Sequence, residues 1–256
     1  MLYNEYINNG KQRTIVLLNG LTQTTAAWGL MVPTLSTQFN ILLIDFHFQG
    51  KSSKDGEWKD FDSHATDVQQ VLKNKQIVAP IICGISYGSM VAQHFAVKYP
   101  AELSGLVLVA TFAHKTPLFN AIELSWFNAL KYGGYKLMLD VMLPYVFSDD
   151  FFAKPLIPID ALKAARMEEM SEQAEFIVKL MMATLHRKDY RTELRNITAP
   201  TLIVQGQKDT LLPTYLSNEV HANIANSNYV ILPNVGHTIN LEAPNELCKL
   251  ILGKFN

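Results

Sequence analysis

The sequence predicts an α/β fold: a doubly wound, mostly parallel sheet with a group of helices inserted after the strand that ends at Ala110. Three observations support this prediction. Short apolar runs alternate with amphipathic stretches over the first 110 residues, the alternation stops between residues 111 and 190, and it resumes after Pro200. Strands of a parallel sheet are covered on both faces, so they appear as continuous apolar runs instead of alternating ones.

Composition restricts the class of protein. The chain has 256 residues, 48% of them apolar and 18% charged, with a net charge of −1. This length fits one large domain or two closely packed domains. A chain of this size can bury a hydrophobic core without the help of disulfides. Two cysteines are too few for a secreted disulfide framework, and there is no basic excess to suggest nucleic acid or anionic lipid. With no signal peptide or membrane span predicted, we expect a cytoplasmic globular protein.

The first half of the chain is expected to form strand–helix–strand units with right-handed crossovers. Strands are predicted at residues 14–18, 40–44, 77–83 and 103–110, and helices at 25–37, 61–73 and 87–98. The last of these helices is expected to end before Pro100, because the residue preceding a proline is pushed out of helical geometry. Ahead of these units, apolar stretches at 2–7 and 11–18 flank Asn9-Gly10, which predicts a β-hairpin.

A helical insertion interrupts the sheet. Apolar residues recur at helical spacing over residues 121–130, 135–142 and 160–185, and strands are predicted again at 201–204 and 228–232 before a closing helix at 241–255. We therefore expect a core formed by residues 1–111 and 191–256, with a cap of residues 112–190 inserted after the strand that ends at Ala110. Long insertions of this kind are typically functional lids. A separate helical domain is the alternative.

The most informative motif is Gly84-Ile85-Ser86-Tyr87-Gly88, which stands between a predicted strand and a predicted helix. Glycines two residues before and after Ser86 allow the backbone to turn sharply, and the turn lifts the hydroxyl above the sheet edge. The N-terminus of the following helix carries partial positive charge and can hold an oxyanion. Ser86 is therefore the candidate nucleophile.

A serine nucleophile needs a base and an acid that orients the base. Asp209 follows the strand at 201–204, and His237 follows the strand at 228–232 with a glycine before it. The order Ser, Asp, His along the chain is the one expected for a nucleophile on such a strand–turn–helix element. Glu242, the nearest competing acid, is expected to begin the closing helix at the surface.

Together these motifs resemble the α/β-hydrolase superfamily, in its small capped branch, over nearly the whole chain. The resemblance implies an oxyanion hole formed by the backbone N–H groups of Leu21 and Tyr87. The chain departs from the family where Asn19-Gly20 replaces the usual His-Gly, which puts the supporting role of that histidine in question.

A second departure lies in the loop Asp45–Ser52, where Phe48 replaces the first glycine of the family pattern D-x-x-G-x-G-x-S. This loop, Asn19-Gly20 and Thr24-Thr25-Ala26 are similar to acyltransferases that act on 3-hydroxyacyl thioesters. That similarity is confined to about the first 55 residues, and the motif around Ser86 is hydrolase-like.

The sequence thus predicts a serine hydrolase that cleaves a carboxylic ester or thioester through an acyl-Ser86 intermediate, with a small-molecule acyl substrate. Acyl transfer and a non-catalytic ligand-binding protein are the alternatives. No ligand-spaced cluster of His, Cys or Asp and no phosphate-binding loop is present, so no metal or organic cofactor is expected. Either a monomer or a homodimer fits the sequence. Aromatic residues of the insertion suggest an apolar acyl pocket, or the insertion's own core: Phe112, Trp126, Phe127, Phe147, Phe151 and Phe152.

Overall fold

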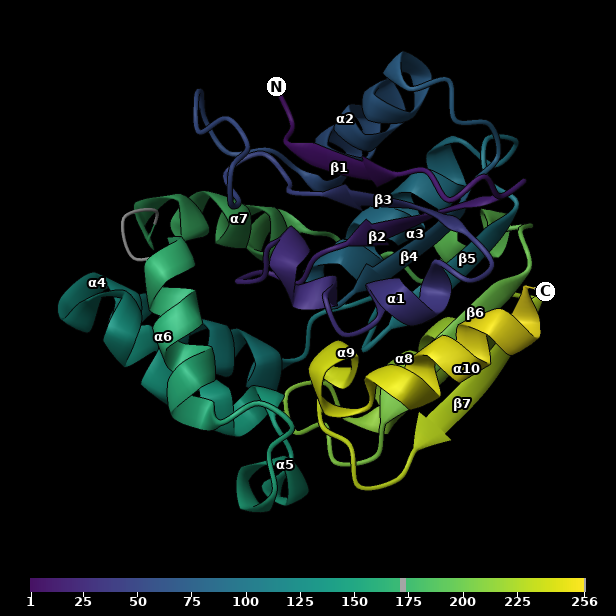
Figure 1. Cartoon of the computed structure of the whole chain (residues 1–256). Coiled ribbons are helices and arrows are strands. Elements are labelled where there is room, and N and C mark those ends of the chain that lie inside the picture. The colour runs from purple at the N-terminus through teal and green to yellow at the C-terminus, as the bar shows by residue number, and fades with distance from the viewer. Residues whose placement is uncertain (171–173, 256) are drawn as a thin grey trace.

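A seven-stranded sheet forms the centre of the computed structural model, which describes residues 1–170 and 174–255 (Figure 1). The strand order is β1-β3-β2-β4-β5-β6-β7, and every neighbouring pair is parallel except β1 with β3. The strands are β1 Asn4–Ile7, β2 Thr14–Leu18, β3 Asn40–Ile44, β4 Ile81–Ile85, β5 Gly105–Val109, β6 Thr201–Gly206 and β7 Ser227–Leu232. All residues of β2 to β6 are buried, as predicted from their continuous apolar character.

Helices cover both faces of the sheet and create two cores. Val68 of α2 (Phe61–Asn74), Phe95 of α3 (Tyr87–Lys98) and Val220 of α8 (Thr214–Asn223) belong to one core. Leu35 of α1 (Val32–Leu35) and Ile251 of α10 (Pro244–Lys254) belong to the other. The doubly wound sheet predicted from the sequence is therefore confirmed. The helix α8 between β6 and β7 was not foreseen.

The predicted hairpin at Asn9-Gly10 is wrong. Strand β1 pairs antiparallel with β3, from Asn4 opposite Ile44 to Ile7 opposite Ile41. Strand β2 has β3 and β4 on its two sides, so it has no free edge for β1. Gly10 does adopt a left-handed conformation (φ 66°). However, the turn takes the chain past β3, from β1 on one edge of that strand to β2 on the other. The side chain of Asn9 fixes this crossing by donating to the Phe39 carbonyl.

The predicted helix at residues 25–37 is two short pieces, a 3₁₀ turn over Thr25–Trp28 and α1 over Val32–Leu35. Pro33 explains the break, because a proline has no N–H to donate to the carbonyl four residues earlier, at Gly29. The closing helix is likewise divided, into α9 (Ile239–Glu242) and α10, with Pro244 as the first residue of α10.

Helices α4 to α7 lie between β5 and β6 in the chain and gather on one side of the molecule (Figure 1). Two predicted helices, 121–130 and 135–142, form the single element α4 (Pro117–Val146), which kinks at Gly134, where φ is 72°. Helix α5 spans Asp149–Ala153. The helix predicted at 160–185 comprises α6 (Ile159–Met170) and α7 (Ala174–His186), and residues 171–173 of that prediction lie outside the described residues. The division into core and cap stays a prediction.

Candidate active site

Ser86 occupies a strained turn between β4 and α3. Its φ of 51° and ψ of −115° lie outside the regions that side-chain-bearing residues favour, a conformation that costs on the order of 1–3 kcal/mol. The Ser86 N–H donates to the Val109 carbonyl at 2.9 Å, which ties the turn to β5. A Cβ on Gly84 would lie 2.1 Å from the Gly88 carbonyl oxygen, and one on Gly88 would lie 2.2 Å from that of Leu18. Both glycines are therefore required for the close approach of β4, α3 and the end of β2.

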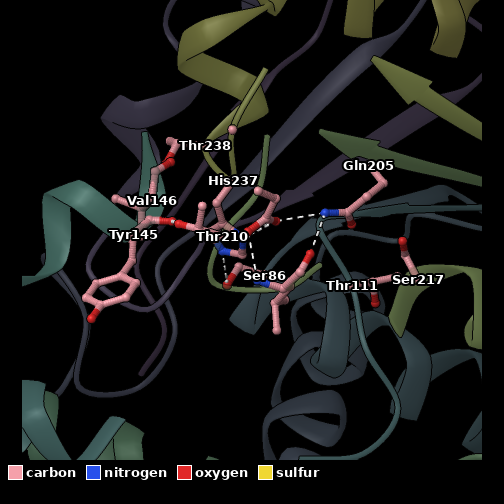
Figure 2. A network of polar contacts seen from close by, with 12 residues as sticks. Ser86, Thr111, Tyr145, Val146, Gln205, Thr210, Ser217, His237 and Thr238 are labelled. Atoms are coloured by element: carbon pink, nitrogen blue, oxygen red, sulfur yellow. Dashed lines mark hydrogen bonds and ion pairs between the residues drawn. The ribbon is translucent and has the colours of Figure 1, made fainter. Parts of the chain in front are cut away.

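His237 lies between Ser86 and Asp209. Its Nε2 is 2.8 Å from Ser86 Oγ (Figure 2), and its Nδ1 is 2.7 Å from Asp209 Oδ2. An ionised carboxylate only accepts hydrogen bonds, so Nδ1 must carry a proton and Nε2 is left to accept from the serine hydroxyl. The structure thus brings together the three side chains that the sequence singled out.

Asp209 is buried in a loop after β6 and is held by two further donors. The Leu212 N–H donates to Oδ1 and the Gln205 side-chain amide donates to Oδ2, both at 2.8 Å. These bonds compensate the cost of burying a carboxylate and fix its orientation toward the imidazole. Gln205, the fifth residue of β6, was not singled out from the sequence, because a glutamine in an apolar run carries no motif.

The loop that carries His237 rests on the end of α4. The Val146 carbonyl accepts hydrogen bonds from the His237 N–H at 3.2 Å, the Thr238 N–H at 3.0 Å and the Thr238 hydroxyl at 3.0 Å (Figure 2). On its other side the loop meets β6, where a Cβ on Gly206 would lie 2.0 Å from the carbonyl oxygen of Gly236. The insertion therefore supports the backbone of the histidine directly.

The expectation that Glu242 begins the closing helix at the surface is wrong. Glu242 is the last residue of α9 and is partly buried. Its Oε2 accepts from the Ser148 hydroxyl at 2.6 Å and from the Gly236 N–H at 3.0 Å. Burial raises the pKa of the Glu242 carboxyl, although these hydrogen bonds oppose the shift. Glu242 thus links the N-terminal cap of α5 to the histidine loop and makes no hydrogen bond to the imidazole.

The loop after β2 brings Leu21 to the same site. The Gln49 side-chain amide donates to the carbonyls of Gly20 at 2.8 Å and Leu21 at 3.1 Å, while Gln23 Oε1 accepts from the Gly20 N–H at 3.1 Å. Tyr87 is the first residue of α3, where backbone N–H groups have no partner within the helix. The sequence motif did not predict that Gln49 would hold this loop.

Asn19 is fully buried beneath that loop. Its Nδ2 donates to the Ile44 carbonyl at 2.9 Å and to Asp45 Oδ1 at 3.1 Å, and its Oδ1 accepts from Trp28 Nε1 at 2.9 Å. Asn19 therefore ties the ends of β2 and β3 together. Phe48 has a φ of 74°, the left-handed region in which glycine is favoured, and its ring is buried.

A cavity of about 60 Å³ adjoins Ser86. Its walls combine the loop after β2, the Ser86 turn, the histidine loop and helices α4 and α6, namely Gly20, Leu21, Thr22, Gln23, Ile85, Ser86, Leu139, Met142, Leu143, Val146, Phe147, Leu162, Arg166, His237, Thr238 and Leu241.

Of the six aromatic residues suggested for an acyl pocket, Phe147 alone lines this cavity. Phe112, Trp126 and Phe151 are buried in the core, and Phe152 is 40% exposed. The alternative that these aromatics mainly build the insertion is therefore favoured.

The described residues offer neither a metal-binding cluster nor a membrane-spanning helix. No group of three or more His, Cys, Asp or Glu side chains there is placed to hold a metal ion. None of the described helices has the length and apolarity needed to cross a membrane.

Comparisons with known proteins agree with this architecture. RutD of Shigella flexneri, named "Putative carbamate hydrolase", is 24% identical over 93% of this chain and 89% of its own. The α/β hydrolase MGS-M2 from a deep-sea metagenome of the Medee basin is 27% identical, with a TM-score of 0.92 over 99% of this chain and 94% of its own. The enol-lactonase of Burkholderia xenovorans is 20% identical, with a TM-score of 0.86 over 98% and 95%.

The similarity of the first 55 residues to acyltransferases is not borne out by these comparisons. The model of the family described as serine aminopeptidase S33 matches residues 10–244. The chain therefore belongs to this hydrolase family, within the α/β-hydrolase superfamily.

Proposed function

We propose that the protein is a serine hydrolase that cleaves a carboxylic ester or thioester through an acyl-Ser86 intermediate. The observation that carries the proposal is the continuous contact from Asp209 through His237 to Ser86, with distances of 2.7 and 2.8 Å. Contacts of this length allow a histidine to remove the serine proton as the hydroxyl attacks.

In the proposed first step, Ser86 Oγ attacks the substrate carbonyl carbon and its proton passes to His237 Nε2. The bond to the leaving oxygen or sulfur then breaks, and the same proton goes to the leaving group. In the second step, a water gives its proton to His237 and attacks the acyl carbon. The Ser86–acyl bond breaks, and the proton returns to Ser86 Oγ. Asp209 stabilises the imidazolium, and the N–H groups of Leu21 and Tyr87 hold the oxyanion.

A carbamate is the second candidate substrate, and the similarity to RutD favours it. A carbamate carbonyl can undergo the same addition at Ser86, with loss of an alcohol or amine. The similarity to an enol-lactonase is instead in line with an ester bond. Assaying carboxylic esters, acyl thioesters and carbamates of matched chain length at one pH separates the two candidates by the ratio of their kcat/KM values.

The proposed nucleophile is tested with a fluorophosphonate probe and mass spectrometry of the intact and digested protein. We expect one probe per chain, on the peptide containing Ser86, and no labelling of Ser86→Ala. Ser104→Ala, which removes an exposed serine far along the chain from the turn, serves as the matched control and should label like the wild type. Persistent labelling of Ser86→Ala, or a wild type that is never labelled, would overturn the proposal and favour a ligand-binding protein.

A further inference from the structure

Arg187 is a buried cation at the point where the inserted helices return to the sheet. It directly follows α7 and is 9% exposed. Its guanidinium donates to two neutral acceptors, the Phe112 carbonyl at 2.9 Å and Gln93 Oε1 at 2.6 Å. The guanidinium carbon also lies 5.2–5.6 Å from the ring centres of Phe61, Phe112 and Tyr190. Burial lowers the pKa of Arg187 to about 10, so the group is charged at neutral pH. An apolar side chain would join α7 to the sheet at a lower desolvation cost.

A continuous series of polar contacts runs from Arg187 to the backbone of Ser86. Gln93 Nε2 donates to Thr111 Oγ1 at 2.7 Å, and Thr111 Oγ1 is 2.9 Å from Ser89 Oγ. The Ser89 hydroxyl in turn donates to the Ser86 carbonyl at 2.6 Å. Gln93, Thr111 and Ser89, called the polar relay below, are fully buried, so their hydrogen bonds are shielded from solvent. The polar relay therefore connects the cation at the end of α7 to the turn that carries the proposed nucleophile.

The polar relay ends on the peptide unit that also contains the Tyr87 N–H, one of the two proposed oxyanion donors. A peptide unit is planar, so a group that fixes the Ser86 carbonyl also fixes the direction of the Tyr87 N–H. That carbonyl accepts from the N–H groups of Ser89 at 2.9 Å and Met90 at 3.3 Å, and the Ser89 hydroxyl adds a shorter contact. Successive hydrogen bonds polarise one another, and a cation at the start of the series adds to the effect.

We propose that Arg187 is a positioning residue that acts through the polar relay to hold the Ser86–Tyr87 peptide unit, so that the Tyr87 N–H points at the oxyanion. Arg187 is not among the residues that line the cavity beside Ser86, so its effect is on the transition state and not on substrate binding. The inference rests on the proposed hydrolase function and adds a residue of the insertion to the machinery of that site.

The first test measures how fast the fluorophosphonate probe labels Ser86 as the probe concentration is varied. We expect Arg187→Met to lower the maximal rate by about 10- to 50-fold, less than the roughly 10²–10³ lost with a whole oxyanion donor. The half-saturating concentration should stay within about twofold of the wild type, because the interaction strengthens only in the transition state. Arg187→Lys, which keeps the charge without the planar fork, should recover part of the rate.

Lys115→Met is the matched control. Lys115 donates to the Leu185 carbonyl, close to the same end of α7, and does not belong to the polar relay. Its replacement therefore removes a polar tie of α7 without interrupting the contacts that reach Ser86. We expect this variant to be labelled at the wild-type rate.

A double-mutant cycle separates positioning from simple anchoring of α7. Thr111→Val interrupts the polar relay while keeping the shape of the side chain, and should slow labelling in the same way as Arg187→Met. Adding Arg187→Met to Thr111→Val should then slow labelling by less than about twofold more, because residues of one hydrogen-bond network are not additive. Urea unfolding verifies that each variant is folded under the conditions of labelling.

Three results would overturn the inference. Arg187→Met could be labelled like the wild type, it could raise the half-saturating concentration without lowering the rate, or its effect could be as large in the Thr111→Val background as alone. The last result would mean that Arg187 only anchors α7. A folded Thr111→Val that is labelled at the wild-type rate also overturns the inference, whether or not Arg187→Met folds.

Failure of the hydrolase proposal is detected separately, because the probe then does not label the wild type. In that case the amide resonance of Tyr87 in ¹⁵N-labelled protein still reports on the same peptide unit. Arg187→Met and Thr111→Val should shift this resonance in the same direction, and Lys115→Met should leave it in place. An unchanged Tyr87 resonance in folded Arg187→Met overturns the inference.

Discussion

Asp209 and Glu242 are two carboxylates that contact the histidine loop, and their partners differ. Asp209 contacts the imidazole Nδ1, whereas Glu242 contacts the Ser148 hydroxyl and the backbone of Gly236. Asp209→Asn should leave the fold intact but favour the wrong imidazole tautomer. We expect kcat to fall by about 10⁴, the cost of the equivalent change in a serine protease, measured with any ester that the wild type cleaves.

Glu242→Gln should cost less than about tenfold in kcat. Glutamine keeps one acceptor oxygen for Ser148 or Gly236, and the hydrogen bonds between His237 and its partners do not involve Glu242. Both variants are measured at one pH, with circular dichroism as the check on folding. A nearly wild-type Asp209→Asn together with an inactive Glu242→Gln would show that the acid has been misassigned.

Phe48 combines a buried ring with a backbone conformation that favours glycine. Phe48→Ala loses the packing and keeps the strain, whereas Phe48→Gly loses the packing and relieves the strain. Both variants should lose about 3–5 kcal/mol of unfolding free energy through the lost ring, with the glycine variant more stable than the alanine variant by about 1 kcal/mol. Urea unfolding of the three proteins measures this. An alanine variant as stable as the glycine variant would contradict the strain argument.

At the scale of elements, strands were predictable where burial is continuous, as in β2 and β3, whose bounds agree with the sequence pattern. The partner of β1 was not predictable, because the Asn9-Gly10 turn is a local signal and strand pairing is decided by which edges are free. The helix predicted at 25–37 was wrong in its extent because Pro33 divides it, whereas the break predicted between residues 130 and 135 agrees with the kink at Gly134.

The same distinction applies to the site. Ser86, Asp209 and His237 could be predicted because each directly follows a strand in the sequence. The ends of parallel strands meet at the same edge of the sheet, so the order of strands along the chain was enough to group these residues. Gln49 was missed because its hydrogen bond reaches Gly20, 29 residues away in the chain, which only folding brings near. Gln205 was missed because a glutamine within an apolar strand carries no motif. Arg166 belongs to α6, and no spacing rule could place that helix at the wall of the cavity beside Ser86.

Replacing residues 112–190 by a short linker tests the predicted cap. We expect the shortened protein to lose discrimination between short and long acyl chains, because α4 and α6 provide most of the apolar cavity wall. Labelling of Ser86 by the fluorophosphonate probe should persist at a reduced rate, since the histidine loop loses the Val146 carbonyl. A folded variant with unchanged chain-length discrimination would show that the insertion is not a lid.

At the scale of the whole molecule, Glu123 makes stability depend on pH. Burial raises the pKa of this carboxyl in α4 to about 7, and Lys115, the charge that faces it, only partly opposes the shift. The folded protein therefore holds a proton that the unfolded chain releases near pH 4.5. The resulting stabilisation is complete below that pH and is lost as the pH rises through about 7.

Glu123→Gln should consequently raise the free energy of unfolding at pH 8 by about 1–3 kcal/mol and change it little at pH 5. Denaturant unfolding at the two pH values provides the measurement. Glu57→Gln, at an exposed position, is the control and should have the same effect at both. A gain at pH 5 that equals the gain at pH 8 would show that Glu123 is ionised throughout.

The contact between the end of α4 and the backbone of His237 has a consequence for building chimaeras of such hydrolases. The C-terminus of a helix carries a partial negative charge, roughly half an elementary charge. Helix α4 ends at Val146, whose carbonyl accepts a hydrogen bond from the His237 N–H. An insertion transplanted from a relative would therefore bring its own electric field to the imidazole as well as its own cavity wall. A graft whose helix stops one turn short would hold the imidazolium less well, even with Ser86 and Asp209 unchanged.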